Sequence, residues 1–217
     1  MSTIKQQTQT TSELIAEQLR NAIIVGDYQS GQALKQDALA KQFEVSKIPV
    51  REALYQLKSE GLVTFLNNRG SIVSKLSISE VEQIYTMRLA LEEIALKRAI
   101  PNFKPANKIA AETALKLIES SDNPLDWAVL NWEFHAGIYR AAAMPKMLET
   151  ISMLHNNVSR YLLLYLKDME YNSVSQDEHW ELLDACNSGN IQVATQVLKK
   201  HLSDALQQTI QFMKQRD

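Results

Sequence analysis

Three of the four histidines in the sequence lie in apolar stripes of separate helical stretches. His135 follows Asn131 by four residues, so these two side chains share one face of a helix. His179 and His201 each recur with apolar residues at helical spacing, which directs all three imidazoles toward a helical core. Convergent imidazoles with one oxygen ligand are typical of sites for a divalent metal such as Zn²⁺ or Ni²⁺. Any one of these histidines alone would more simply be a hydrogen-bonded core residue, but the trio favours a metal site.

Further side chains in the same half could line a cavity beside this cluster. Arg88 lies in an apolar stripe, and a buried guanidinium must be paired. Its partner is either Glu92, four residues along the helix, or the carboxylate of a bound effector. Trp132 adjoins the oxygen ligand and could form a wall of the pocket. His155 and Arg160 are the remaining effector-binding candidates, although His155 could also be a residue at the edge of the core.

A second set of chemically useful residues lies between positions 46 and 58. Lys47, Arg51, Tyr55 and Lys58 are three or four residues apart, so they share one helical face, opposite an apolar one. Arg51 could bind guanine O6 and N7 through two hydrogen bonds, whereas Lys47 would do so less well or neutralise a phosphate. Ser46, as the N-cap, and the backbone N–H groups at this helix end could bind a phosphate.

The surrounding elements predict a winged helix-turn-helix that presents this face to DNA. Glycines and polar turns separate three amphipathic helices, and a hairpin follows. The first two predicted helices cover 12–25 and 36–43, and the third begins after Ser46 and is ended by Gly61. The predicted strands cover 63–66 and 71–74. Pro49 falls in the first turn of the third helix, where its missing N–H costs little. We include Pro49, Lys35 and the hairpin-tip residue Arg69 among the DNA-contacting residues, with Arg69 in the minor groove or on the backbone.

The remainder of the chain shows helical periodicity without a strand-like segment. Prolines and short polar runs divide it into helices at about 77–100, 106–120, 124–142, 145–167, 175–187 and 190–214. The expected fold is therefore mainly α: an N-terminal winged helix-turn-helix domain, 1–76, and a C-terminal six-helix antiparallel bundle, 77–217.

Composition excludes several other classes of protein. The 217 residues have a formal net charge of −2, and the first 76 carry a slight excess of basic side chains. The single cysteine, Cys186, rules out an internal disulfide, suits a reducing compartment and lies in an apolar stripe. The N-terminal stretch is polar, and no apolar run reaches the roughly 20 residues that span a bilayer. We therefore expect a cytoplasmic protein without a membrane partner.

The motif VSKIPVREAL at 45–54, with EGLV at 60–63 and NRG at 68–70, resembles the GntR family of bacterial transcription regulators. The second half resembles the FCD domain of the FadR subfamily in its shorter VanR-like form, through Arg88-x-x-Leu91-Glu92, Phe134-His135, Glu178-His179 and His201-Leu202. The resemblance implies a regulator, more often a repressor, that binds palindromic operator DNA as a homodimer and responds to a small carboxylate effector. It also implies a metal held by an Asp and three His.

Three positions depart from the pattern of the family that the chain resembles. Asn131 stands where the metal-binding Asp is expected, alongside His135, His179 and His201. A neutral amide oxygen is a weaker ligand than a carboxylate, so metal affinity should fall unless the effector supplies its own carboxylate. Lys47 stands where the family usually has Arg. Asp37 stands at a position that is often Arg in related proteins, so a contact with the DNA backbone or a base could be lost there.

Two alternatives remain at this point. In the first, the chain is a DNA-binding regulator whose bundle is free of metal and serves only dimerisation. In the second, it is a metal-dependent hydrolase with Glu133 as the base. The second is disfavoured because Glu133 lies two residues from both Asn131 and His135, on another helical face, and because it leaves the DNA-reading domain unexplained.

Overall fold

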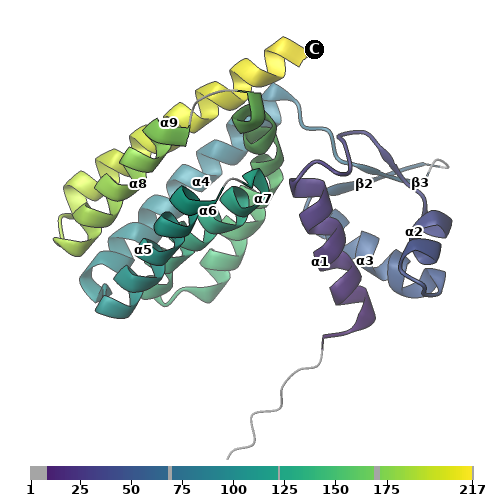
Figure 1. The fold of residues 1–217 in the computed structure, drawn as a ribbon, viewed down its shortest axis with the longest axis horizontal. Coiled ribbons are helices and arrows are strands. Elements are labelled where there is room, and N and C mark those ends of the chain that lie inside the picture. The colour runs from purple at the N-terminus through teal and green to yellow at the C-terminus, as the bar shows by residue number, and fades with distance from the viewer. Residues whose placement is uncertain (1–8, 68–69, 122, 169–171, 217) are drawn as a thin grey trace, which may run out of the picture. The chain divides into compact units, whose positions relative to one another are not determined.

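The computed structural model describes residues 9–67, 70–121, 123–168 and 172–216, although not the side chains of 124, 125, 160, 162–168, 172–174 and 216. The chain forms two compact units, Met1–Lys75 and Leu76–Asp217, and each is described by itself. The described part is predominantly helical, as expected, and includes a small sheet in the first unit (Figure 1).

The first unit packs three helices, α1 (Thr11–Ile24), α2 (Gln36–Gln42) and α3 (Lys47–Ser59), around one apolar core. Helix α1 begins slightly earlier than predicted, because Thr10 rather than Ser12 caps it and forms a capping box with Glu13. Arg20 on α1 binds the Glu60 carboxylate at the end of α3 through Nε and Nη2, at 2.7 and 2.6 Å. This bidentate ion pair joins the last part of α1 to the carboxyl end of α3.

The ends of α2 and α3 define the turns before and after α3. The predicted stop at Gly61 is confirmed: Leu62 N–H donates to Leu57 O at 3.0 Å, and Gly61 has a φ of 81°. The same geometry ends α2, but there the left-handed residue is Glu44, with a φ of 55°. A side chain in this conformation is strained relative to glycine, so the turn between α2 and α3 stores a small conformational cost.

The wing is a sheet of three antiparallel strands in the order β1-β3-β2. Strands β2 (Val63–Leu66) and β3 (Gly70–Val73) form the predicted hairpin, with β3 starting one residue early. The prediction of two strands was incomplete, because β1 (Ala33–Leu34) also pairs with β3. A strand of two residues has no alternation that a sequence pattern could reveal.

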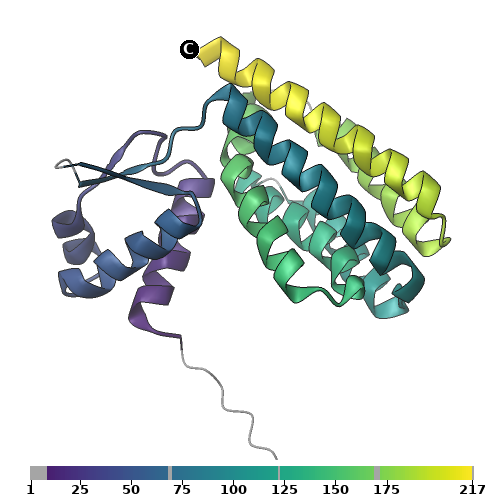
Figure 2. The same ribbon diagram turned by 180° about the vertical axis from the view of Figure 1, so that it is seen from behind.

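The second unit is a bundle of helices, six of them α-helices in the part of the chain that the structure describes. Their bounds are α4 (Ile78–Ala99), α5 (Pro105–Ser120), α6 (Pro124–Tyr139), α7 (Pro145–Asp168), α8 (Asn172–Asn187) and α9 (Ile191–Arg216). Helices α4 and α9 run side by side in both views (Figures 1 and 2). Helix α7 packs on α4, α6 and α9, and α8 packs on α9, so the middle of the bundle lies among α4, α6, α7, α8 and α9.

Local details differ from the predicted helix boundaries. Short 3₁₀ turns, η1 (Ile100–Asn102) and η2 (Arg140–Ala142), follow α4 and α6, so α6 ends before the expected residue 142. Helix α8 begins at Asn172, where a break was expected. Helix α6 approaches α5 closely at Gly137, where an added Cβ would lie 3.1 Å from the backbone nitrogen of Ala111. Within the described residues, no helix combines the length and apolar character needed to cross a membrane.

Candidate functional site

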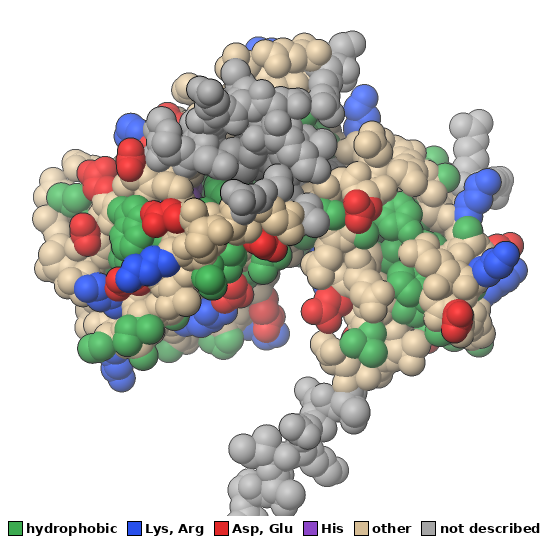
Figure 3. Space-filling view, in the orientation of Figure 1, with side chains coloured by type: hydrophobic (Ala, Val, Ile, Leu, Met, Phe, Trp, Pro, Cys, Tyr) green, Lys and Arg blue, Asp and Glu red, His purple; other side chains and the backbone are tan. Residues whose placement is uncertain are grey.

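The three predicted histidines do come together in the middle of the bundle. His135 on α6, His179 on α8 and His201 on α9 are all buried, and one ligand atom from each lies within 4.8 Å of the others. The ring centroids of His179 and His201 are 4.6 Å apart, and that of His135 lies 5.3 and 5.4 Å from them. On the face drawn in Figure 3, outside the grey atoms, almost no histidine surface is visible, in agreement with this burial.

Hydrogen bonds assign the tautomers of two of these imidazoles. His179 Nδ1 lies 2.8 Å from Gln176 Oε1, and His201 Nδ1 lies 3.0 Å from Glu178 Oε2. Both partners are oxygen acceptors, so each Nδ1 carries the proton and each Nε2 keeps a free lone pair. Metal-ligating histidines in proteins are oriented in the same way: the ring nitrogen that does not bind the metal donates its N–H to an acceptor.

The electrostatics of the cluster favour the neutral form of His135 and of His179. Burial, with smaller contributions from neighbouring histidines, lowers the pKa of His135 and of His179 well below the usual value of 6.5. Although burial acts in the opposite direction, hydrogen bonds from His201 and Lys200 lower the pKa of Glu178 to about 2. The site therefore combines two neutral imidazoles, His135 and His179, with the ionised carboxylate of Glu178, which is hydrogen-bonded to His201.

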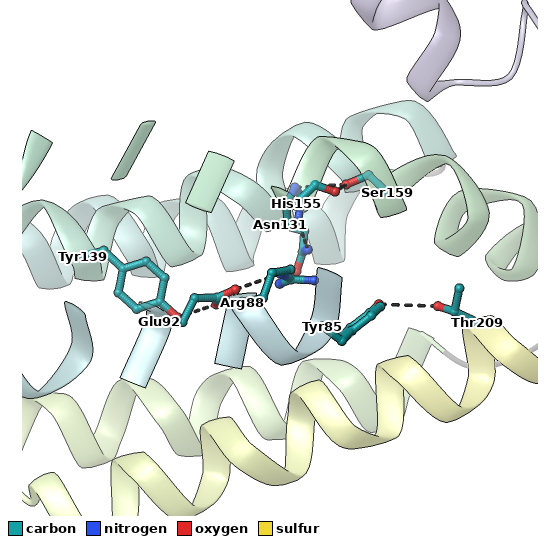
Figure 4. A network of polar contacts seen from close by, with 8 residues as sticks. All are labelled: Tyr85, Arg88, Glu92, Asn131, Tyr139, His155, Ser159 and Thr209. Atoms are coloured by element: carbon teal, nitrogen blue, oxygen red, sulfur yellow. Dashed lines mark hydrogen bonds and ion pairs between the residues drawn. The ribbon is translucent and has the colours of Figure 1, made fainter. Parts of the chain in front are cut away.

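Asn131 makes a hydrogen bond that the sequence did not suggest. Its Nδ2 lies 3.1 Å from His155 Nε2, and His155 Nδ1 lies 3.0 Å from Ser159 Oγ (Figure 4). Ser159 already uses its only proton in a 2.7 Å bond to the His155 carbonyl, so it must accept from Nδ1–H. His155 Nε2 is then an acceptor, and Asn131 must donate to it through its amide nitrogen. This chain of donors leaves Asn131 Oδ1 available for another partner.

Several buried polar atoms of this site have no hydrogen-bond partner among the described residues. They are Asn131 Oδ1, both ring nitrogens of His135, and His179 Nε2. Orphaned buried polar atoms are uncommon in proteins, and each requires an explanation. Three buried imidazoles with ligand atoms within 4.8 Å of one another fit the requirements of a divalent cation, and Asn131 Oδ1 is a further unpartnered acceptor on the cavity that His201 lines.

Arg88 is paired with Glu92, as one of the two alternatives predicted. Its Nε donates to Glu92 Oε1 at 2.8 Å, and the Tyr139 hydroxyl donates to Glu92 Oε2 at 2.8 Å (Figure 4). The Arg88 guanidinium also lies over the Tyr85 ring, 5.1 Å from its centroid, and faces the cavity described next. Pairing with Glu92 therefore does not remove Arg88 from the candidate effector site.

A small cavity of about 20 Å³ lies beside the histidine cluster and is bounded by His201, but not by His135 or His179. Its lining includes four predicted site residues, Arg88, Asn131, His155 and His201. Trp132 is half-buried and packs its ring 5.4 Å from that of His155 rather than lining the cavity. The side chain of Arg160 lies outside the described residues.

Besides Glu178 and Tyr139, sequence reasoning missed five further polar or aromatic residues around the site. Ser159 follows His155 by one helical turn and Gln176 precedes His179 by three residues, so helical spacing could have suggested both. The others, which line the cavity, are Tyr85, Trp127 and Ser175. Their sequence pattern is that of ordinary core residues.

Helix α3 presents the predicted DNA-reading face. Val50, Ala53, Leu54 and Leu57 are fully buried, whereas Lys47 and Arg51 are exposed on the other side. Ser46 occupies the N-cap position with extended backbone, and its hydroxyl makes no capping bond within the described residues. Lys35 is also exposed, and Pro49 is half-buried in the first turn of α3. Arg69 lies outside the described residues.

Two further residues on this surface were not predicted as contacts. Asp37 on α2 forms an exposed ion pair with Lys47, so the first basic residue of α3 carries its own counter-ion. Ile48 is 69% exposed in the first turn of α3, beside Lys47. An exposed large apolar side chain at that position is a chemical feature that a search for charges overlooks.

Glu133 does not face the histidine cluster. Its carboxylate accepts from Arg140 Nη2 at 2.8 Å, and both side chains are exposed. The base required by the hydrolase alternative is therefore directed away from the buried site.

Comparisons with known proteins agree with this architecture. The model of the bacterial regulatory proteins, gntR family, matches residues 11–73, and the FCD domain model matches residues 83–204. The HTH-type transcriptional repressor GlaR of Escherichia coli is 27% identical over 195 residues, 85% of this chain and 89% of its own. A probable D-xylose utilization operon transcriptional repressor of Paenarthrobacter nicotinovorans is 27% identical over 214 residues, 96% and 93% of the two chains.

Solved structures share the fold over nearly the whole chain. E. coli McbR/YncC has a TM-score of 0.82 at 20% identity and covers 97% of this chain and 100% of its own. A GntR family regulator from Pseudomonas syringae has a TM-score of 0.61 at 31% identity, with 95% and 87% coverage. The chain belongs to the GntR family of bacterial transcription regulators, with an FCD domain as its second half, and is a metabolite-responsive regulator rather than an enzyme.

Proposed function

We propose that the amino end of α3 enters the major groove of operator DNA and that Arg51 reads a guanine there. Support comes from the exposure of Lys47, Ile48 and Arg51 on one side of a helix whose opposite face is fully buried. Lys47 neutralises a phosphate or contacts a base edge, and Ile48 offers its apolar surface to a thymine methyl group. The Ser46 end of the helix binds a phosphate through backbone N–H groups.

The remaining predicted contacts position the protein on the duplex. Lys35 lies at the start of α2 and binds the phosphate backbone, and Pro49 fixes the first turn of α3. Arg69, between the two strands of the wing hairpin, reaches the adjacent minor groove or the backbone. Two chains bind as a homodimer on a palindromic operator, because one recognition helix reads only a few base pairs. The regulator acts in the cytoplasm, where its DNA is found.

We further propose that the bundle senses a small carboxylate effector at a metal-containing site. His135, His179, His201 and Asn131 would hold the ion, Zn²⁺ or Ni²⁺, and a bound divalent ion supplies positive charge for an anionic ligand. The observation that carries this proposal is the buried cluster of three imidazoles whose ligand atoms lie within 4.8 Å of one another. No carboxylate belongs to the proposed ligand set, so the positive charge of the ion would be neutralised by an anionic effector.

Arg88 supplies a second cationic group facing the same cavity, beside His155. Because Glu92 already holds Arg88 in place, an effector carboxylate meets a guanidinium with restricted freedom. The Trp132 ring packs against the His155 ring and helps to hold it in place. We retain Arg160, on α7, as a further candidate contact of the effector.

The size of the cavity explains how the effector could regulate DNA binding. About 20 Å³ holds roughly one water molecule, so a metabolite can enter only if the surrounding helices move. The effector therefore binds the open arrangement more tightly than the closed one, and this difference shifts the population between the two. We propose that the closed arrangement represses transcription and that the effector releases the operator, in keeping with relatives named as repressors.

Metal analysis of the purified full-length chain tests the sensor. We expect stoichiometric divalent metal by mass spectrometry, loss of the metal on chelation with a lower melting temperature, and recovery with Zn²⁺ or Ni²⁺. A chain that neither contains nor takes up either ion, and whose melting temperature does not respond to a panel of small carboxylates, would contradict the proposal. That result would leave the bundle as a dimerisation module alone.

A further inference from the structure

The exposed face of α3 carries a continuous stack of cationic and aromatic side chains. The Arg51 guanidinium lies over the Tyr55 ring, 5.5 Å from its centroid. The Tyr55 ring is stacked on Phe65, with centroids 4.8 Å apart and an interplanar angle of 13°. The Lys58 ammonium lies 5.7 Å from the Phe65 centroid. We call these four residues, Arg51, Tyr55, Phe65 and Lys58, the α3–wing stack.

The stack joins two elements that are separate in sequence. Arg51, Tyr55 and Lys58 belong to α3, whereas Phe65 lies on β2, the strand that leads to the tip of the wing hairpin. Phe65 also packs against the apolar core of the first unit, and this contact restricts its position. Tyr55 is 47% exposed. Its ring contacts the Phe65 ring and the Arg51 guanidinium.

The physical effect on Arg51 follows from this arrangement. An arginine side chain loses rotamer entropy when it is fixed, and an unsupported surface arginine incurs this loss when it binds DNA. A cation over an aromatic face is held by about 0.5–1 kcal/mol at an exposed site. The ring on which Arg51 rests is itself fixed by a second ring on the wing, so part of the ordering is complete before DNA is bound.

We propose that Tyr55 and Phe65 are positioning residues for DNA recognition, which hold Arg51 in its base-reading orientation and fix the wing relative to α3. The inference rests on the proposed role of Arg51 at a base edge. On this inference, part of the DNA sequence specificity comes from Tyr55 and Phe65, although neither residue need touch a base.

The test is a double-mutant cycle measured with the full-length protein and a duplex that the protein selects from a randomised library. Affinities are measured for the wild type, Arg51→Ala, Tyr55→Ala and the double variant at one fixed salt concentration. Tyr55→Phe keeps the ring and removes the hydroxyl. Leu14→Ala is the matched control, because Leu14 is a comparably exposed side chain, 44%, on α1 of the same unit.

We expect Tyr55→Ala to weaken binding about two- to fivefold per chain, the loss of one exposed cation–aromatic contact. Tyr55→Phe and Leu14→Ala should bind as the wild type does. In the Arg51→Ala background, Tyr55→Ala should have no further effect. In the free protein, Tyr55→Ala should also abolish the ring-current shift of the Arg51 side-chain resonances in nuclear magnetic resonance spectra.

Each other outcome overturns the inference and identifies where it fails. Equal losses from Tyr55→Ala with and without Arg51 would show that the ring acts independently of Arg51. A loss in Tyr55→Phe equal to that in Tyr55→Ala would show that the hydroxyl, and not the ring, contributes to binding. If Arg51→Ala itself leaves affinity and sequence preference unchanged, the proposed role of Arg51 fails and the inference fails with it. If Arg51→Ala is costly and the two losses are additive, only the inference fails.

Discussion

Asn131→Asp would restore a carboxylate to the metal-binding set, and the structure predicts opposite effects on the metal-free and metal-loaded protein. The Asn131 amide donates to His155 Nε2, and a carboxylate cannot donate. In the metal-free variant, His155 must move its ring proton to Nε2, which disrupts its 3.0 Å bond with Ser159. We therefore expect the metal-free variant to be less stable than the wild type by about 1–3 kcal/mol, the cost of leaving a buried polar group unsatisfied.

With the ion bound, the added charge should dominate. A unit charge 4 Å from another is stabilised by about 4 kcal/mol at an effective dielectric constant of 20, and an ion of charge two doubles this figure. Removing a carboxylate from water costs several kcal/mol, so much of the gain is offset. A remaining gain of only about 1.4 kcal/mol would still tighten metal binding tenfold.

Competition against a chelator of known affinity measures this change, and thermal unfolding in the presence of excess chelator measures the metal-free stability. Asn157→Asp is the matched control. Asn157 is buried, as Asn131 is, but it lies on α7 and does not belong to the cavity lining that the structure describes. Equal metal retention by the wild type and Asn131→Asp would refute the assignment of residue 131 as a ligand. A gain of the same size in Asn157→Asp would refute the local origin of the effect.

Four further predictions follow from the geometry. Burial lowers the pKa of His155 to about 3, so the unfolded chain binds the extra proton below about pH 6.5. The metal-free protein should then lose about 1.4 kcal/mol of stability per pH unit from His155 as the pH falls below 6.5, whereas constant stability down to pH 5 in denaturant titrations would contradict its burial as a neutral group. Asp37→Asn releases Lys47 from its exposed ion pair, so DNA binding should tighten, and its salt dependence should steepen by about 0.9 per chain in a log–log plot; an unchanged slope argues against a phosphate contact. Uracil in place of a contacted thymine should weaken wild-type binding about fourfold, the value of one buried methyl group, and should leave Ile48→Ala unaffected; equal sensitivity of the two proteins rules out the apolar contact. Glu44→Gly removes a side chain from left-handed backbone and should stabilise the protein by about 0.5–1 kcal/mol in urea titrations, whereas a loss of stability would show that the Glu44 side chain is needed.

Local pattern was sufficient to predict the helix-turn-helix. The exposed and buried faces of α3 follow from its 3.6-residue periodicity, and Gly61 followed by Leu62 marks its end. The three histidines could be placed for the same reason, because helical periodicity assigns each of them to an apolar face. The Arg88–Glu92 pair was accessible as a contact across one helical turn.

Contacts between elements were beyond the reach of the sequence. Asn131 and His155 are 24 residues apart on α6 and α7, and their hydrogen bond depends on how these helices pack. The stacking of Tyr55 on Phe65 depends on the position of β2 beside α3. Strand β1 forms because β3 lies next to it, not because its two residues carry a strand pattern. In each case the determining partner lies on another element of the fold.

The most direct test of the central claim is the sequence preference of Arg51→Ala. The ratio between affinities for the selected duplex and for a scrambled duplex of equal length is measured for both proteins at the same salt concentration. The wild type should show a large ratio, and Arg51→Ala should lose about 1–3 kcal/mol of discrimination per chain while keeping its melting temperature. An unchanged ratio in a folded Arg51→Ala variant would contradict the conclusion that the amino end of α3 reads the operator.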